Sequence, residues 1–599
     1  MADYETCSVD VLVIGAGGAG LRAGIEAAAN GATTAIVCKS LLGKAHTVMA
    51  EGGIAAALSN VWTDDSWKVH FRDTMRGGKM LNNWHMAELH AQEAPDRVLE
   101  LESWGALFDR TPDGRILQRD FGGHRFARLA HVGDRTGLEM IRTLQDRAVA
   151  AGIEVFMECK IIRLLAGPSG EVCGALGIWR ESGTFIVFCA KAVILASGGI
   201  GKVWKFTSNS WESTGDGHAL ALWAGAELID MECVQFHPTG MIWPASARGL
   251  LVTEGVRGDG GILKNESGER FMFRYIPEYY AKETADTIEE ADQWYDDKSF
   301  RRPPDLLPRD EVARAINAEV KAGRGTPHGG VYLDIASRRS PEYIRRRLPS
   351  MYKQFKELAD VDITTQMMEI GPTCHYMMGG VRVDADTQAS TLAGLYAAGE
   401  VAGGMHGANR LGGNSSSDLL VFGRRAGMAA AEHARGLARP PEPDPAVIER
   451  GKAEALAYFD HAGGESPYAL HHELQEAMQS LVGIIRTASE LERAIEILDE
   501  LDGRARRVVV EGHRQFNPAW HLALDLEAML AVARSTTLSA IARRESRGGH
   551  TRDDYPDPDP EHFGKVNMVV QLAGGDVTVA ERPVVPMPAE LAGLLEDGH

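Results

Sequence analysis

Four short segments of the chain combine glycine with histidine, arginine and threonine, a mixture that suits the binding of a negatively charged ligand. Glycine lets the backbone approach a ligand closely, and the other three residue types hold carboxylates through bidentate or charge-assisted hydrogen bonds. A substrate with two carboxylates would use several of these groups. The segments are 235–240 (QFHPTG), 253–261 (TEGVRGDGG), 371–380 (GPTCHYMMGG) and 406–416 (HGANRLGGNSS), and residues 308–316 (PRDEVARAI) add two arginines.

Another set of residues suits phosphate binding. The β-branched run at residues 9–14 is followed by GAGGAG at 15–20, an alanine-rich helix at 21–30 and a second strand at 33–38. In such a unit the free N–H groups at the start of the helix can hold a pyrophosphate. Lys39 and Ser40 stand where an acidic residue would bind the ribose, which counts against a plain NAD enzyme.

Two later strands also end in small residues, at 192–199 (AVILASGG) and 394–400 (GLYAAGE). Because ligands of doubly wound sheets lie beyond the carboxyl ends of the strands, we expect the three strand ends to converge on one long cofactor, for which FAD has the natural length. His46 follows the second strand directly. Its imidazole could attack a flavin methyl group or could be structural, and spacing alone leaves both interpretations open.

The rest of the chain divides by its residue pattern. Residues 231–352 are irregular, proline-punctuated and charged, which indicates an inserted domain. Residues 440–547 have apolar residues at helical spacing, and the acidic, proline-rich stretch 553–560 precedes a small end piece. We therefore expect an α/β fold with a Rossmann-like FAD-binding domain at 1–235 and 353–432, a capping domain at 236–352, a helical bundle at 433–547 and a C-terminal domain at 548–599.

Composition narrows the class of protein. The 599 residues include 63 basic and 83 acidic side chains, and a net charge of −20 repels nucleic acid. The seven cysteines lie at least 14 positions apart, so there is no CxxC framework for a metal or an iron–sulfur cluster. No apolar run has the roughly 18 residues of a membrane span, and the first one lacks a basic flank. We expect a cytosolic chain with no metal and no nucleic-acid partner.

Taken in order, HTVxAEGG, QFHPTG, TEGVRGDGG, PTCHYMMGG and HGANRLGGNS resemble the flavoprotein subunit of succinate dehydrogenase and fumarate reductase, and the resemblance covers essentially the whole chain. It implies that His46 is joined covalently to the FAD ring, which raises the flavin potential. The other FAD contacts that it implies are Gly15, Ala16, Gly17, Gly18, Ala19, Gly20, Lys39, Ser40, Gly52, Gly53, Asp216, Glu400, Ser415 and Ser416. From the sequence, Asp216 could also be a helix N-cap.

The same resemblance implies a substrate site. Its carboxylate-binding residues would be His237, Thr253, His375 and Arg410, with Phe121, Gly122 and Gly123 lining the pocket. Arg309 would accept the proton in succinate oxidation and donate it in the reverse direction, through a relay of Arg257, Glu254 and Arg309. Arginine is almost always protonated, so the role needs such a relay. These three residues could otherwise form a structural ion-pair network.

Two positions depart from the family pattern. Lys44 and Ala45 stand where Arg-Ser is usual beside the attachment histidine, and Asp259 stands where Glu is commoner. The first change adjoins the site of flavin attachment.

The resemblance further implies partners. Because the chain has no cluster ligands, electrons would pass through an iron–sulfur subunit to a quinone at membrane anchor subunits, which would hold this chain peripherally at the cytoplasmic face of the membrane. Fumarate reduction at the same site is the alternative direction. L-aspartate oxidase, with noncovalent FAD, is a less favoured alternative, because His46 argues against it. An FAD-binding assembly protein without turnover would need broken pocket residues, whereas here all are present.

Overall fold

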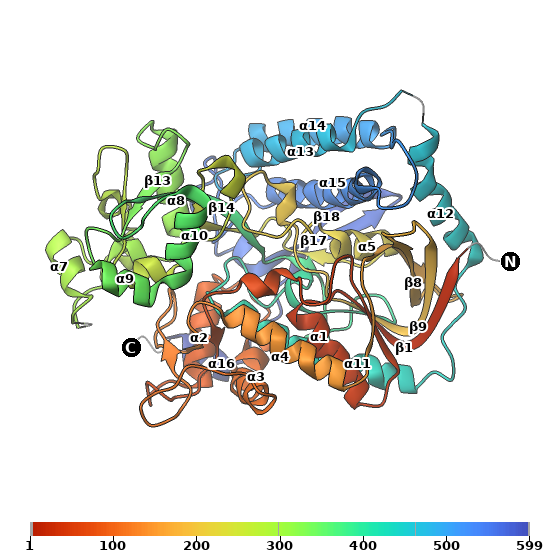
Figure 1. The fold of residues 1–599 in the computed structure, drawn as a ribbon, viewed down its shortest axis with the longest axis horizontal. Coiled ribbons are helices and arrows are strands. Elements are labelled where there is room, and N and C mark those ends of the chain that lie inside the picture. Colours follow the sequence, from red (N-terminus) through yellow and green to blue (C-terminus); the bar gives the residue numbers. More distant parts are fainter. Residues whose placement is uncertain (1–3, 298, 462, 597–599) are drawn as a thin grey trace.

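The computed structural model describes residues 4–297, 299–461 and 463–596 (Figure 1). In the view of Figure 1, a body of green elements lies on the left, blue helices lie along the top, and the largest sheet lies on the right with helices below it. Within these described ranges, no helix is both long and apolar enough to cross a membrane.

A seven-stranded sheet brings the expected strand ends together. Its order is β6-β2-β1-β9-β8-β7, and β16 pairs with β9. The end of β1 lies beside the end of β9, with Ile14 opposite Leu195, and Leu195 lies opposite Ala397 of β16. All three strands run parallel, so the predicted convergence is confirmed. The bounds are β1 Glu5–Ile14, β2 Thr34–Val37, β6 Glu154–Phe156, β7 Cys159–Ala166, β8 Val172–Trp179, β9 Phe185–Leu195 and β16 Leu395–Ala397.

Backbone contacts that only glycine permits hold the turn after β1 against the sheet. Gly15 has a φ of +119°, and a Cβ at this position would collide with the carbonyl of Ala196. A Cβ on Gly20 would in turn collide with the carbonyl of Gly15. The turn therefore passes tightly beneath helix α1 (Gly18–Ala29), as the motif predicts.

Helices cover both faces of this sheet, so its strands are apolar on both sides. Along β1, Leu12 and Ile14 belong to one core, whereas Val11 and Val13 belong to another. This burial on two faces is typical of parallel strands. Helices α1, α4 (Thr136–Ala150) and α11 (Asn414–Arg435) lie below the sheet in Figure 1, with α2 (Trp67–Gly77) and α3 (Trp84–Ser103) beside them, and α5 (Asp216–Ala224) lies above.

The inserted region has its own sheet and core. Antiparallel strands run in the order β11-β14-β13-β12. Helix α8 packs on β11 and carries Arg309 at its first position. The bounds are β11 Val234–Met241, α6 Gly255–Gly258, β12 Ile262–Lys264, α7 Ile288–Gln293, α8 Arg309–Lys321, β13 Val331–Asp334, α9 Pro341–Arg347, α10 Pro349–Ala359 and β14 Met368–Met377.

The helical region expected after residue 440 is present. It consists of α12 (Pro445–Asp460), α13 (Pro467–Leu481), α14 (Ala488–Ala505) and α15 (Pro518–Ala542). Helix α15 is buried along most of its length and packs against both α14 and α5. It therefore connects the helical region to the FAD-binding region.

The C-terminal strands join the FAD-binding region in one sheet. Strands β17 (Val566–Ala573) and β18 (Asp576–Pro583) form a hairpin, and β17 pairs with β10 (Leu228–Ile229), which also pairs with β15 (Gly380–Val381). Beside this sheet, the fully buried Arg543 forms ion pairs with Glu232 (2.5 Å) and Glu545 (3.0 Å). Breaking such a buried pair leaves an uncompensated charge, so these contacts hold the two regions together. The last helix, α16 (Ala589–Glu596), lies against α2.

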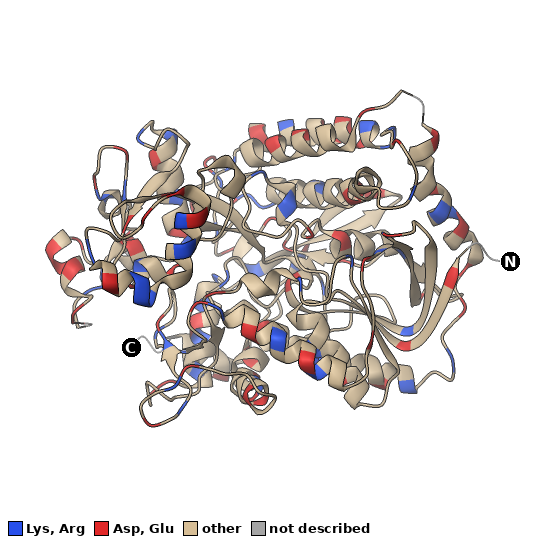
Figure 2. Cartoon of the chain, in the orientation of Figure 1, with Lys and Arg blue, Asp and Glu red and all other residues tan. Residues whose placement is uncertain are grey.

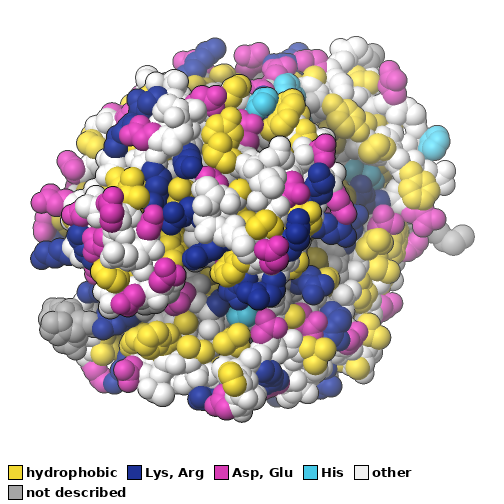
Figure 3. Space-filling model, turned by 60° about the vertical axis from the view of Figure 1, so that its left-hand side comes forward, with side chains coloured by type: hydrophobic (Ala, Val, Ile, Leu, Met, Phe, Trp, Pro, Cys, Tyr) yellow, Lys and Arg dark blue, Asp and Glu magenta, His cyan; other side chains and the backbone are white. Residues whose placement is uncertain are grey.

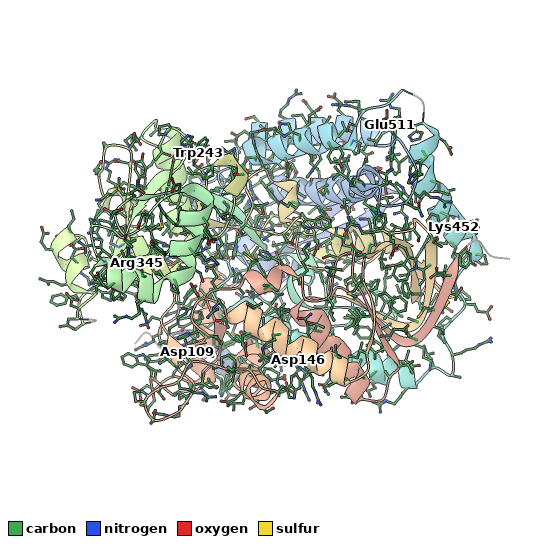
Figure 4. All side chains as sticks on the ribbon, viewed as in Figure 1. Asp109, Asp146, Trp243, Arg345, Lys452 and Glu511 are labelled. Carbon is green, nitrogen blue, oxygen red and sulfur yellow. The ribbon has the colours of Figure 1, made fainter. Side chains whose placement is uncertain are left out.

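Charges of both signs are spread over the molecule. Figure 2 shows lysine, arginine, aspartate and glutamate residues on most helices, and Figure 3 shows both signs interspersed with small apolar groups on one face. Trp243 and Arg345 lie on the left-hand body, Lys452 and Glu511 on the right-hand side (Figure 4).

The predicted α/β fold class is confirmed. The domain boundaries remain predictions. The inserted sheet runs from Val234 to Met377, so it extends beyond the proposed capping domain of residues 236–352 at both ends.

Candidate functional site

A long cavity runs along the ends of β1, β9 and β16. It encloses about 1590 Å³, including open space at its mouth. It extends from Lys160 and Asp216 at one end to His375 and Arg410 at the other. The predicted site residues that line it are Gly15, Ala16, Gly17, Gly18, Ala19, Lys39, Ser40, His46, Gly52, Gly53, Asp216, Arg309, His375, Glu400, Arg410, Ser415 and Ser416.

The glycine turn forms part of the cavity wall. Residues 15–19 line it at the start of α1, whose first N–H groups point outward from the helix end and suit a phosphate. Gly20 does not line the cavity, because it packs against Gly15. Its part in the motif is therefore packing of the helix on the turn.

At the end of β2, Lys39 belongs to a buried group of four charges. Its Nζ lies 2.7 Å from Asp216 and 3.1 Å from Asp525 on α15, and Lys160 also pairs with both carboxylates. Burial opposes the charge of Lys39, but Asp216 and Asp525 raise its pKa above the usual value. The interpretation of Asp216 as a helix N-cap is wrong, since Gly215 caps α5 and the Asp216 carboxylate accepts from both lysines.

Glu212 lies at the same end of the cavity, and sequence reasoning missed it. It lines the cavity together with Ser40, and its Oε1 is buried without a hydrogen-bond partner among the described residues. Burial raises the pKa of Glu212, while Ser40 and Lys39 lower it. Its carboxylate can accept hydrogen bonds from the hydroxyls of a ribose, whereas the ammonium group of Lys39 at the strand end can only donate.

His46 begins a short 3-10 helix, residues His46–Met49, on the cavity wall. Its Nε2 accepts a hydrogen bond from Asn209 Nδ2 at 3.3 Å. Burial, with the positive charge of Arg410 nearby, lowers the pKa of His46 to about 4. The ring is therefore neutral at pH 7, the form in which a ring nitrogen can act as a nucleophile.

Glu51 was not singled out, although it lies in the HTVxAEGG motif. It lines the cavity beside Gly52 and Gly53, and its Oε2 has no hydrogen-bond partner among the described residues. Burial, with the charge of Asp134, raises the pKa of Glu51 to about 8. A neutral carboxyl therefore stands in the wall of the cavity at pH 7.

Two histidines and an arginine converge at the far end. The rings of His237 and His375 are 5.1 Å apart, and His375 Nδ1 lies 2.8 Å from Ser208 Oγ. Arg410 donates to Ser415 Oγ at 2.8 Å and to Gln235 Oε1 at 3.0 Å. Burial lowers the pKa of Arg410 to about 9, and the positive charge of the nearby Arg309 contributes to this shift.

The proposed relay residues are in contact. Arg309 Nε lies 3.1 Å from Glu254 Oε2, and Arg257 lies 3.9 Å from the same oxygen. Burial would raise the pKa of Glu254, but the two arginines lower it more, so its carboxylate is ionised. Only Arg309 of the three lines the cavity, with its guanidinium 5.6 Å from the ring of Phe121.

The remaining predicted pocket residues lie behind this end. Phe121 lines the cavity, whereas Gly122 donates its N–H to Glu254 at 3.0 Å. Neither Gly123, His237 nor Thr253 is among the residues that line the cavity; Thr253 lies next to Glu51. In the part of the chain that the structure describes, no group of His, Cys, Asp and Glu is arranged to hold a metal ion.

Comparisons with known proteins show which class of protein the chain belongs to. Residues 10–416 match the FAD binding domain family, and residues 471–592 match the fumarate reductase flavoprotein C-terminal family. The chain is thus an FAD-binding flavoprotein. It belongs to the flavoprotein subunit family of succinate dehydrogenase and fumarate reductase.

Similar proteins carry both names. A fumarate reductase (CoM/CoB) chain of Methanothermobacter marburgensis is 45% identical over 93% of this chain and 96% of that protein. The succinate dehydrogenase flavoprotein subunit of Coxiella burnetii is 37% identical over 98% of both chains. Among solved structures, Sdh1 of Mycobacterium smegmatis in complex with UQ1 has 58% identity and a TM-score of 0.88, covering 99% of this chain and 97% of that one.

We predict that Glu51→Gln removes a pH-dependent loss of stability. A folded-state pKa of about 8, above the ordinary value of 4.5, means that the folded chain favours the protonated carboxyl. Its stabilising contribution is full below about pH 4.5 and is lost as the pH rises to about 8. Melting temperatures measured between about pH 5 and pH 9 should therefore increasingly favour the variant as the pH rises.

The matched control is Glu357→Gln, on the exposed side of α10. Its melting temperature should differ from that of the unmodified chain by the same small amount at every pH. A difference for Glu51→Gln that stays constant across this range would contradict the prediction.

Proposed function

We propose that the chain oxidises succinate to fumarate with FAD bound covalently through His46. The observation that carries the proposal is the long cavity, which places a glycine cradle, His46 and a cluster of buried positive groups in one continuous space. A cofactor with a pyrophosphate fits the cradle, and a dianion fits the end at Arg410 and His375.

The unpartnered polar atoms of the cavity also fit FAD. Ser197 Oγ and His46 Nδ1 are buried without a hydrogen-bond partner among the described residues. Buried polar groups are normally hydrogen-bonded, so these atoms are suited to a polar ligand. When bound, FAD supplies the acceptor for the hydride that leaves succinate.

The protein residues would then bind and orient the substrate. The Arg410 guanidinium holds one carboxylate in a bidentate manner, and its hydrogen bond to Ser415 fixes its direction. His375 would hold the other carboxylate from the cavity wall. His237, whose ring is 5.1 Å from that of His375, and Thr253, next to Glu51, would complete this binding group from behind the wall. Burial, and then neighbouring arginines, lower the pKa of both histidines well below the usual value, so they act as neutral hydrogen-bonding groups.

Arg309 would take the proton from the substrate carbon. It is the relay residue that lines the cavity, and its contact with Glu254, which also faces Arg257, gives the proton a path away from the substrate. Two guanidinium groups face the one ionised carboxylate of Glu254, so a proton lost by Arg309 would leave one positive charge on Arg257 balanced by one negative charge on Glu254. In fumarate reduction the same group would donate.

We propose the same partners for this chain as the family implies. The neighbour structures include Sdh1 with UQ1 and a quinol-fumarate reductase with menaquinol molecules. By analogy, an iron–sulfur subunit takes the electrons to a quinone held by membrane anchor subunits, with this chain peripheral at the cytoplasmic face. Fumarate reduction is the second candidate, favoured by the name of the methanogen relative.

Assays of the purified complex test the activity. We expect reduction of a ubiquinone analogue by succinate to be faster than oxidation of menaquinol by fumarate, because a covalent flavin of raised potential accepts a hydride from succinate more readily. Faster fumarate reduction would favour the second candidate. Peroxide formed from aspartate and oxygen would instead support L-aspartate oxidase and overturn the proposal, and so would the absence of any dicarboxylate turnover.

Covalent attachment is tested by His46→Ser. The unmodified protein should keep its yellow flavin after denaturation and washing, whereas the variant should release it. Bound flavin in the native variant, measured by absorbance, should remain detectable because the glycine cradle is intact. Complete loss of flavin from the denatured unmodified protein would show that the cofactor is not covalent.

Arg309→Gln should abolish turnover and leave the flavin content unchanged. A positioned acid–base group typically contributes about 10²–10⁴-fold to the rate, and Arg309 lies outside the glycine cradle. Steady-state rates and the absorbance of bound flavin measure the two effects. Arg345→Gln, on the exposed outside of the same region (Figure 4), is the control and should keep full activity. Substantial activity of Arg309→Gln would remove this residue from the mechanism.

A further inference from the structure

Three histidines outside the proposed catalytic set lie together in the interior. His70 is on α2, His90 is on α3 and His124 follows the Phe121 loop. The ring of His70 is 5.1 Å from that of His90 and 5.9 Å from that of His124. His70 and His90 have no exposed surface, and His124 is 6% exposed.

Each ring uses Nε2 to hold the same short segment, residues 412–417. His70 Nε2 lies 2.9 Å from Asn414 Oδ1, His90 Nε2 lies 2.8 Å from Ser417 Oγ, and His124 Nε2 lies 2.7 Å from the carbonyl oxygen of Gly412. Three neighbouring parts of the chain therefore hold one turn that lies 288 to 344 residues further along.

The acceptors determine which ring nitrogen carries the proton. A carbonyl oxygen only accepts, so His124 donates from Nε2. The amide of Asn414 donates through Nδ2 to Thr74 Oγ1 at 3.0 Å, which leaves its Oδ1 to accept from His70. The hydroxyl of Ser417 donates to the carbonyl of Asn414 at 3.2 Å, so its oxygen accepts from His90.

Burial keeps the three rings neutral. Burial lowers the pKa of His90 and of His124 to about 3, and that of His70 well below the usual value. The nearby Arg128, paired with Asp65 and Asp73 at 2.9 Å each, further opposes a charge on the rings. The Nδ1 atoms of the three rings have no hydrogen-bond partner among the described residues.

The segment that they hold forms part of the cavity wall. Ser415 and Ser416 line the cavity, and Ser415 accepts the hydrogen bond of Arg410. A Cβ on Gly412 would collide with the ring of Phe121, so the 121–124 loop and the 412–417 segment are in direct contact. The hydrogen bond from His124 to the carbonyl of Gly412 joins this loop to the segment.

We propose that His70, His90 and His124 are positioning residues for dicarboxylate binding. As neutral donors they fix residues 412–417, and through Ser415 they fix the direction of the Arg410 guanidinium. The inference rests on the proposed dicarboxylate site. These histidines would therefore raise the affinity for substrate although they do not touch it.

A matched pair of variants at His124 tests it. Glutamine places an N–H near the position of Nε2, whereas leucine has similar bulk and no donor. In the leucine variant the Gly412 carbonyl has lost its donor. One hydrogen bond is worth about a tenfold effect. We therefore expect the KM for succinate, and the Kd for the nonreactive dicarboxylate malonate, to rise roughly tenfold. His124→Gln should keep both near the unmodified values, and kcat should change less than KM in either variant.

His461→Leu is the control. His461 Nδ1 lies 2.8 Å from the carbonyl oxygen of Val508 in the helical region, so its loss also costs a partly buried contact, but it does not line the cavity. Its KM and Kd should stay unchanged even if its melting temperature falls. The pair His90→Gln and His90→Leu decides the matter if His124→Leu yields no folded flavoprotein.

The possible results separate the two proposals. If the unmodified protein neither turns over succinate nor binds malonate, the proposed function fails. If it does both, then equal KM values for the leucine variant and the unmodified protein overturn the positioning role. A glutamine variant as weak as the leucine variant, or a KM increase in His461→Leu, overturns it as well.

Discussion

Buried positive charge is the constraint on which the site depends. The chain carries a net charge of −20, yet Arg257 and Arg410 are buried at this site, and Arg257 and the partly buried Arg309 share the carboxylate of Glu254. Among the described residues Arg410 has no ion-pair partner, and burial lowers its pKa to about 9. Removing charges from water is costly unless they are paired. A dianion at this end of the cavity would supply the missing charge, so the same feature that costs stability creates affinity.

Holding this charge in place requires a rigid frame, and close backbone packing provides it. Gly15 lies against the carbonyl of Ala196, and Gly20 lies against Gly15, so the phosphate turn has no room for a side chain. Protein interiors respond poorly to added volume. The positions of β1, β9 and β16 relative to one another are therefore set by backbone contact, and the cavity follows their ends over its length.

The local parts of this frame could be predicted from sequence, because their signals are local. The β1–α1–β2 unit and the three converging strand ends follow from short apolar runs and glycine motifs. Asp525 could not be predicted, because it reaches Lys39 from a helix nearly the whole chain away and belongs to no motif. The pairing of β17 with β10 was missed for the same reason. Glu51 could have been found, since it lies inside a quoted motif, but its neutrality depends on burial, which a motif does not show.

The turn of residues 406–417 carries Arg410 and Ser415 of the cavity wall, and the type of contact that Arg410 can make bears on the direction of the proposed reaction. Arg410 faces the dicarboxylate end, and its neighbour Ser415 lines the same cavity. Succinate and fumarate carry the same two carboxylates, so under the proposed function an arginine and two neutral histidines would hold both by charge and hydrogen bonding alone. Preference for one of them must come from interactions that differ in the transition state or from the electron potential of the cofactor and its acceptors. Under the proposed function, the positions of the binding residues would therefore determine the substrate class, whereas the direction would depend on the redox partners.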